Sequence, residues 1–205
     1  MSISKFYETS IAEIAREKQA ILTIKSKLNG AEVVVPAFLT SFTQTFTSNW
    51  NEEEVYGRMD PIATFQGTRR SISLAFDLPS PNVEVAKENL NQCDKLAQFL
   101  YPGYVDQKGE DAQGKIVSNG KTISRPPLVA VKFANLISAG GAAQLGYLSG
   151  LEWTPVLEMG MFTSSDSLYP KVISLSFTLN VLHQATKGLG SGNTWISGSS
   201  TFFGK

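Results

Sequence analysis

The chain has 205 residues, a length that suits one domain with short appended arms. Eighteen basic and eighteen acidic residues give a formal net charge of zero, which argues against a protein that binds nucleic acid through a basic face. The single cysteine, Cys93, excludes an internal disulfide, and no apolar run approaches the ~20 residues of a membrane-spanning helix. These features predict a soluble protein that folds in a reducing cytoplasm and has no stable membrane binding.

The N-terminal segment, residues 1–19, is predicted to be a helical arm that lies on a neighbour. Residues 20–28 then alternate between apolar and basic side chains, as a half-buried strand does. Asn29-Gly30 is a strong hairpin signal and leads into a second strand at residues 32–35. Pro36 indicates an edge position or a bulge, because proline cannot donate to a strand ladder.

The stretch from Phe38 to Leu78 dominates the chain and is predicted to form two strands joined by a charged loop. From Phe38 to Trp50, the larger side chains occupy the even positions, whereas the odd positions are mostly short and hydroxylated. Residues 71–78 repeat the alternation. Period-two patterning rich in threonine and phenylalanine is typical of a half-buried strand.

The joining loop is interpreted as a contact surface. Tryptophan, tyrosine and arginine are enriched at interface anchors, and this loop holds all three beside a run of acids, Glu52–Glu54. Six of its residues are predicted to lie at a subunit interface: Trp50, Asn51, Tyr56, Arg58, Met59 and Asp60.

A helix is predicted at about residues 81–101, with Ser80 as its N-cap and Pro81 in its first position. Its apolar residues recur at three- and four-residue spacing, so one face should pack on the sheet. Cys93 belongs to this stripe, which is formed by Val83, Ala86, Leu90, Cys93, Ala97 and Leu100. We therefore expect Cys93 to be a small core residue rather than a reactive thiol.

Residues 103–127 form a polar, glycine-rich excursion that contains an Asn119-Gly120 turn signal. This extended loop is either a hairpin or an ordered loop, and loops of this length are usually functional or ordered by a partner. Further strands are predicted at residues 128–133, 151–156, 158–162 and 171–183.

The C-terminal tail, residues 185–205, is rich in glycine and serine and cannot build a core of its own. Its aromatic residues indicate that it docks on something, such as a neighbouring subunit; the alternative is a frayed terminus. The predicted contact residues are Trp195, Phe202 and Phe203.

Residues suited to catalysis are scarce. His183 is the only histidine, so one chain cannot assemble a zinc site of the usual kind. Residues 109–116 match the glycines and lysine of a phosphate loop, but Ile116 stands where a magnesium-binding hydroxyl is needed. We expect no enzyme activity, no cofactor and no metal. The prediction is a mainly β, antiparallel domain at residues 20–184, a sandwich or half-barrel with one packed helix.

One block of residues resembles baseplate and tail-tube-type proteins of contractile-tailed bacteriophages. It runs Asn51-x-x-x-Val55-Tyr56-Gly57-Arg58-Met59-Asp60-Pro61-Ile62 and continues with Thr68-Arg69-Arg70-x-Ile72. The resemblance continues in the same order at residues 131–137, 146–148, 170–173 and 181–183. It implies a tube fold, in which six copies form a ring and their inner strands merge into one β-barrel around a lumen.

The resemblance also implies a function. Similar proteins are structural virion components of the phage tail, assembled in the host cytoplasm, that join the baseplate hub to the first tail-tube ring and initiate tube assembly. The expected partners are five further copies, the adjoining tube ring and the hub proteins, with DNA only as cargo in the lumen. The loop from Trp50 to Ile62 would then meet adjacent subunits. Glu52–Glu54 are hypothesised to keep a DNA-conducting surface from binding phosphate.

Three other functions stay open. A main tail-tube subunit belongs to the same class. A carbohydrate- or cell-wall-binding β module would use Trp50, Trp153 and Trp195. An enzyme would have to use His183 as its base.

Overall fold

The computed structural model describes residues 10–110, 116–138, 142–164, 166–183, 188–190 and 193–196. Its centre is one seven-stranded sheet in the order β2-β1-β7-β8-β11-β4-β3, with every neighbouring pair antiparallel. The strands of this sheet are β1 (Ile21–Ser26), β2 (Glu32–Pro36), β3 (Phe38–Glu53), β4 (Ile62–Pro79), β7 (Val129–Phe133), β8 (Gln144–Pro155) and β11 (Val172–Val181). The expectation of a mainly β, antiparallel fold is confirmed, and seven of its strands lie in one continuous sheet.

Two further two-stranded hairpins and a few helices complete the described residues. The hairpins are β5 (Gly103–Glu110) with β6 (Ile116–Arg125), and β9 (Met161–Ser164) with β10 (Ser167–Pro170). The helices are α1 (Ser10–Glu17), α2 (Val83–Gln98) and the short 3-10 turn η2 (Leu157–Met159). None of the helices that the structure describes has the length and apolar composition of a membrane-spanning segment.

The core lies between one face of the sheet and α2. Strands β4 and β11 pair so that their apolar residues share this face, and Phe76 meets Phe177 edge to face with ring centroids 6.1 Å apart. Strands β1, β2 and β7 close the core from the other end of the sheet. The largest fully buried side chains include Leu22, Ile24, Ile72, Leu74, Phe76, Leu78, Leu96, Ile173, Leu175 and Leu179.

The cap of α2 differs from the prediction. Asn82, not Ser80, is the N-cap: its extended backbone lets Oδ1 accept a hydrogen bond from the Val85 amide at 2.8 Å. Ser80 is buried instead, and its Oγ accepts a hydrogen bond from Asn89 Nδ2 at 2.9 Å. Cys93 is buried, as expected.

The predicted N-terminal hairpin is confirmed. Strands β1 and β2 pair around the Asn29-Gly30 turn, where Gly30 has a positive φ of 72°. Pro36 ends β2, which is an edge strand of the sheet. The predicted N-terminal helix is described only as α1, because residues 1–9 lie outside the described residues.

Several strand boundaries required correction. Strand β3 continues to Glu53, so Trp50 and Asn51 lie in a strand rather than in the loop. Register shifts after Leu39 and after Asn49 break the strict alternation: Phe38 lies opposite Asp77, whereas Phe42 lies opposite Leu74. The excursion at 103–127 is a hairpin, and Asn119-Gly120 lies inside β6.

The strand predicted at residues 151–156 is confirmed but begins earlier, because β8 starts at Gln144 and spans twelve residues. The predicted strand at 158–162 is divided between η2 and the start of β9. Periodicity missed the first half of β8 because Gly146 and Gly150 interrupt its apolar pattern.

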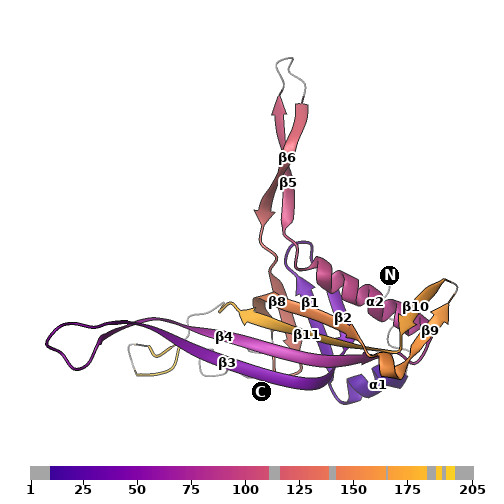
Figure 1. Cartoon of the computed structure of the whole chain (residues 1–205), viewed down its shortest axis with the longest axis horizontal. Helices are drawn as coiled ribbons and strands as arrows, with labels where there is room; N and C mark the ends of the chain where they lie inside the picture. Colours follow the sequence, from indigo (N-terminus) through magenta and orange to yellow (C-terminus); the bar gives the residue numbers. More distant parts are fainter. Residues whose placement is uncertain are drawn as a thin grey trace.

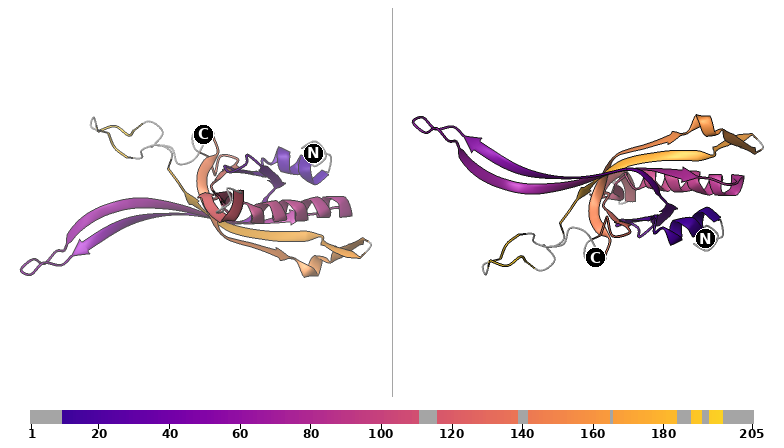
Figure 2. Two further views of the ribbon diagram at one scale, coloured as in Figure 1. Left: turned by 90° about the horizontal axis from the view of Figure 1, so that it is seen from above. Right: turned by 90° about the horizontal axis from the view of Figure 1, so that it is seen from below.

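The two long hairpins give the molecule its shape. The ends of β3 and β4 extend well beyond the body in one direction, and β5–β6 projects at a large angle to them (Figure 1). The β9–β10 hairpin lies at the end of the body opposite to the tip of β3–β4, and both views in Figure 2 show the same arrangement. The molecule therefore has two distinct ends along its longest axis.

Candidate subunit-interaction surfaces

The first surface is the outer half of the β3–β4 hairpin. Strand β4 pairs with β11 only from Ser71 onward, so residues 62–70 of β4 pair with β3 alone. We call residues 46–70 the arm. It brings together the six interface residues predicted from the loop, Trp50, Asn51, Tyr56, Arg58, Met59 and Asp60, all of them exposed.

The arm carries exposed apolar side chains although it has no core of its own. Trp50 packs edge to face on Phe65 with ring centroids 5.2 Å apart, and its Nε1 donates a hydrogen bond to Ser48 Oγ at 2.9 Å. Tyr56 and Met59 at the tip are fully exposed. Phe65 was missed by the sequence analysis because only the strand register places it beside Trp50. Isolated two-stranded ribbons are marginally stable in water, so such an arm gains from a partner.

The base of the arm is fixed to the body by polar contacts. Arg70 is almost fully buried, and its Nη2 donates a hydrogen bond to Gln44 Oε1 at 3.2 Å. Gln44 Nε2 in turn donates to the Leu136 carbonyl at 3.1 Å. The guanidinium also lies over the ring of Phe46 at 5.5 Å, and desolvation lowers the pKa of Arg70. These contacts fix the orientation of the arm relative to the sheet.

The second surface, which we call the end surface, lies at the opposite end of the molecule. It consists of exposed apolar side chains on the end of β8, on η2 and on β9–β10: Trp153, Leu157, Met159, Met161 and Leu168. Five large apolar side chains are exposed within sixteen residues, which makes this end of the molecule a candidate interaction site. Of these, the sequence analysis considered only Trp153, because exposed and buried apolar residues look alike in a sequence.

Two lysines border the end surface. Lys87 Nζ lies 5.2 Å from the ring centroid of Tyr169, and Lys171 Nζ lies 5.4 Å from that of Phe162. Lys87 also donates a hydrogen bond to Ser164 Oγ at 3.5 Å. Neither lysine forms an ion pair within the part of the chain that the structure describes. Acids lie near both lysines in sequence: Asp166 precedes Lys171 by five residues, and Glu88 directly follows Lys87.

The third surface is the sheet face that points away from α2, which we call the hydroxyl face. Its side chains come from alternate positions of β3, β4, β11 and β8, and they hydrogen-bond across the strands. Ser73 Oγ and Thr178 Oγ1 share a hydrogen bond of 3.0 Å, and Ser174 Oγ donates to Asp77 Oδ1 at 2.6 Å. Its residues in the body of the sheet are Phe38, Ser41, Thr43, Thr45, Ser71, Ser73, Ala75, Asp77, Pro79, Tyr147, Ser149, Glu152, Thr154, Val172, Ser174, Ser176, Thr178 and Asn180.

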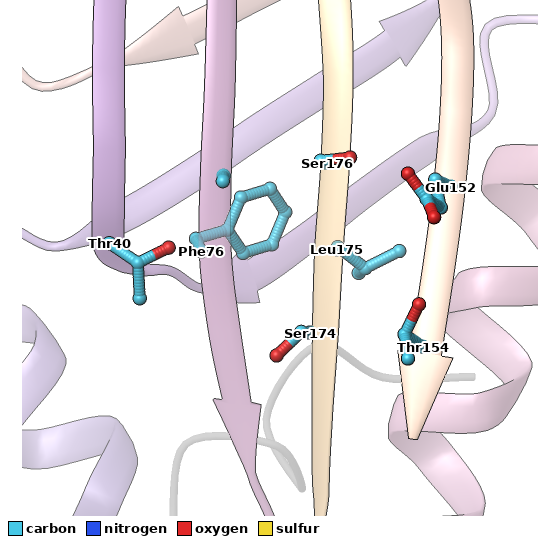
Figure 3. A pocket seen from close by; sticks show the side chains of 8 residues that line it. Thr40, Phe76, Glu152, Thr154, Ser174, Leu175 and Ser176 are labelled. Atoms are coloured by element: carbon cyan, nitrogen blue, oxygen red, sulfur yellow. The ribbon is translucent and has the colours of Figure 1, made fainter. Parts of the chain in front are cut away.

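The charge of the hydroxyl face is acidic. Within the body its only charged residues are Asp77 and Glu152, and Arg69 is reached only on the arm. A shallow hollow of about 170 Å³ opens among Thr40, Glu152 and the strand hydroxyls, as Figure 3 shows. This volume is below the ~300 Å³ at which ligand pockets begin. The hollow is therefore smaller than an ordinary ligand pocket.

Sheet edges supply a further pair of surfaces. The outer edge of β3 has no strand beside it in the described residues. Strand β8 pairs with β7 only through residues 144–146, so its outer edge is also unpaired from Tyr147 to Pro155. The four strands β8-β11-β4-β3 thus form a unit with two open margins. Open margins are templates for pairing with another chain.

The remaining predicted contacts are distributed elsewhere. Trp195 is exposed and forms an isolated bridge with Leu189. Phe202 and Phe203 lie outside the described residues. The β5–β6 hairpin and the turn before it carry exposed apolar side chains that the sequence analysis did not single out: Tyr101, Tyr104, Val105 and Ile123.

Groups with metal-binding chemistry do not gather in one place within the described ranges. Among the described residues no three histidine, cysteine or acidic side chains lie close enough to hold a metal ion. Burial raises the pKa of the Cys93 thiol to about 11, which removes its nucleophilic form at neutral pH. His183 follows the end of β11 and is exposed.

No protein-family model matches this chain. A search of curated proteins finds no match either.

Proposed function

We propose that this chain is a structural subunit of a contractile phage tail, and that it closes into a hexameric ring around a lumen for DNA. The observation that carries the proposal is the four-stranded unit with open margins at β3 and β8. Closing a sheet on itself removes every exposed edge, and identical copies do so by cyclic symmetry.

The direction of the strands supports ring closure. The four strands alternate in direction, so β8 runs opposite to β3. A copy rotated about an axis along the strands would therefore place its β8 beside β3 of its neighbour with antiparallel polarity. An odd number of strands would force a parallel junction. With four strands in each copy, every interface between copies has the same antiparallel pairing.

The side chains along the β3 edge also favour pairing. Strand β3 has sixteen residues, and it contains no lysine and no proline. Charged edge residues, especially lysine, and proline are the usual devices that keep an edge from pairing. Its acids, Glu52 and Glu53, lie at the far end, on the arm. A long edge without protection fits a strand that has a partner in the assembled state.

The hydroxyl face suits the inner wall of such a ring. Six copies of four strands, spaced about 4.8 Å apart, would give a barrel roughly 37 Å across between opposite backbones, and strand tilt would widen it. The short serine and threonine side chains on this face would leave room for a nucleic-acid duplex. Asp77 and Glu152 would repel phosphate rather than bind it. The hypothesis that Glu52–Glu54 do the same now concerns the arm instead of the barrel wall.

The place of the ring within the tail follows from the resemblance alone, which implies the junction between the hub and the tube. A main tube subunit would use the same ring. The glycan-binding alternative is less favoured, because Trp50 lies on the arm and Trp153 on the end surface, so the two do not form one platform.

The experiment is to measure the mass and symmetry of the purified protein by sedimentation and negative-stain microscopy. We expect particles of about six times the 22.3 kDa of one chain, with six-fold symmetry and an open centre. A monomer that persists at high concentration would contradict the proposal, and binding of that monomer to glycans would favour the carbohydrate module.

A further inference from the structure

We infer that the β5–β6 hairpin of one copy packs on β3 of the neighbouring copy in the same ring and so clasps each lateral junction. The contact lies on the side of β3 that faces the core, opposite to the hydroxyl face. The inference rests on the proposed ring and adds a side-chain contact to its backbone pairing. The partner of the hairpin is thus a second copy of this chain.

The root of the hairpin lies beside the open margin of β8. Only residues 126–128, two of them prolines, separate the end of β6 from the start of β7. Strand β7 pairs with β8 through Val129 and Gly146, and β8 has no partner on this side from Tyr147 onward. Consecutive prolines donate no N–H group, so the ladder ends here. A strand that pairs with the open margin of β8 therefore reaches the root of the hairpin.

The strand register brings β3 of a neighbour to this root. Tyr147 of β8 pairs with Asn180, which pairs with Ser71 on its other side. Ser71 in turn pairs with Thr45 of β3, so these residues lie at one level across the sheet. A copy rotated about an axis along the strands keeps this level. Closing a barrel adds a stagger between copies, so we take residues 39–46 as the contact.

The hairpin extends in the direction in which a neighbour would be added. Strands β3, β4, β11 and β8 follow one another across the sheet, and β5–β6 projects beyond β8, away from β3 (Figure 1). The hairpin begins at Gly103, shortly after the end of α2, so it leaves the body on the α2 side of the sheet. A neighbour at the margin of β8 would therefore present the core-side face of its β3 to the hairpin.

This face of β3 is incompletely covered within its own chain. It carries three apolar side chains, Leu39, Phe42 and Phe46, which we call the strip, and their partners on β4 are all buried. Leu39 and Phe42 are only partly buried at the border of the core, and Phe46 is 45% exposed. Because β3 is the last strand of the sheet, no further strand in the described residues extends the core over the strip.

The hairpin offers a matching apolar pair next to its root. Tyr104 and Ile123 pair directly across β5 and β6, so their side chains share one face, and they are 55% and 63% exposed. Tyr104 follows the first residue of the hairpin, and a strand paired with β8 would lie only about 4.8 Å from it. Two-stranded ribbons are marginally stable in water, so burial of this pair on the strip would stabilise both copies.

The clasp would also select the register of the junction. Backbone hydrogen bonds repeat along a strand, and the hydroxyl-face side chains of β3 are short and similar to one another. Register is weakly specified where side chains do not distinguish one pairing from another. A fixed apolar contact at the start of the open margin would remove this ambiguity.

The first test is photo-cross-linking from the hairpin in the full chain. The photoreactive amino acid p-benzoylphenylalanine replaces Tyr104 in one variant and Val105 in the matched control. Both native side chains are 55% exposed, and as neighbours in a strand they lie on opposite faces. Rings assembled from equal amounts of isotopically labelled and unlabelled protein are irradiated, digested and examined by mass spectrometry. We expect the probe at position 104 to couple to residues 38–48 in pairs of mixed isotopic composition, and the probe at 105 not to do so.

The second test measures assembly by sedimentation velocity over a dilution series. The clasp variant is Tyr104→Ser with Ile123→Ser, and the control is Val105→Ser with Thr122→Ser, which is the neighbouring cross-strand pair. All four positions are exposed, so folding should be retained. We expect the clasp variant to raise the concentration of half-assembly roughly tenfold or more, as loss of an interface anchor does, and the control to change it less than about threefold.

Three results would overturn the inference while leaving the proposed ring intact. They are coupling from position 104 only within one copy or only to segments other than β3, equal coupling to β3 from positions 104 and 105, and equal effects of the two double variants on assembly. Failure of the wild-type protein to form rings at any concentration contradicts the proposed function instead, and the inference with it.

Discussion

Gly146 lies where three strands meet, opposite Val129 of β7 and Val181 of β11. A Cβ atom built on it would clash with the Asn180 carbonyl oxygen and would lie 2.7 Å from Leu179 Cδ1. Because a backbone atom cannot rotate away, the site admits only glycine. The close approach of β8 to β11 therefore depends on this residue, and with it the open margin of β8.

Replacing Gly146 with alanine should destabilise the fold by about 1–3 kcal/mol, the usual cost of overpacking. The control is Gly103→Ala, where the nearest atom to a new Cβ lies at 3.5 Å. We expect that variant to unfold within roughly 0.5 kcal/mol of the wild-type protein. Urea unfolding of both variants supplies the measurement, and equal losses of stability would show that the β8–β11 contact is not as close as described.

Cys93 gives a pH dependence with a defined sign. Burial raises the pKa of its thiol from 9.0 to about 11, so the unfolded chain loses this proton at a lower pH than the folded chain. Its contribution to stability is thus fully present below pH 9 and is lost as the pH rises toward 11. This rise in the thiol pKa corresponds to a loss of roughly 3 kcal/mol in the free energy of unfolding.

The comparison is between the wild-type protein and Cys93→Ala, unfolded in urea at pH 8 and at pH 10.5 under reducing conditions. Other groups titrate in both proteins, so the difference between them isolates the thiol. We expect the wild-type protein to lose stability relative to Cys93→Ala between the two pH values. A difference that does not change with pH would mean that the thiol is not buried in the folded protein.

At the scale of elements, the arm is separable from the body. Ser48 pairs with Thr68, and Asn49 pairs with Gly67. Deleting residues 50–66 therefore joins Asn49 directly to Gly67 and leaves a two-residue Asn-Gly turn between the paired residues Ser48 and Thr68. Asn-Gly is the most favourable sequence for a two-residue hairpin turn.

We expect this deletion variant to unfold with the same free energy as the wild-type protein to within roughly 1 kcal/mol, because the deleted residues pair only with each other. It should still form rings, because the proposed β3–β8 pairing lies in the body. Calorimetry and sedimentation check the two statements separately. A large loss of stability would show that the arm belongs to the folding unit, and loss of rings would show that the arm takes part in ring closure.

The sequence predicts a strand well when one of its faces is buried and the other is exposed. Strands with one apolar and one polar face, such as the second half of β4 and all of β11, were identified from alternation. The bulges of β3 have no residue signature, so the orientation of Phe38 was missed. In the Ser80-Pro81-Asn82 segment two residues are able to cap a helix, and only the backbone conformation selects Asn82.

The candidate surfaces were predictable in part for a related reason. The arm was found because tryptophan, tyrosine and arginine stand among acids, where a core strand has no such residues. The end surface was missed because exposed and buried apolar residues look alike in a sequence. The open margins of β3 and β8 depend on strand order, which no local pattern contains.

At the scale of the whole molecule, the polar and apolar surfaces are segregated by direction. The hydroxyl face covers one side of the sheet, α2 covers the other, and the two apolar surfaces lie at the ends. In the proposed ring, the open edges of β3 and β8 would pair laterally and the hydroxyl face would line the lumen.

The central claim is that β3 and β8 pair with each other in neighbouring copies, and amide hydrogen exchange tests it most directly. Exchange is followed by mass spectrometry in dilute and in concentrated, ring-forming protein. We predict that peptides covering residues 38–48 and 147–155 become protected together, while interior β4 and β11 peptides, already paired on both sides, change little. Protection of β3 alone would indicate two-fold pairing of this edge, and unchanged exchange at both edges would contradict the ring.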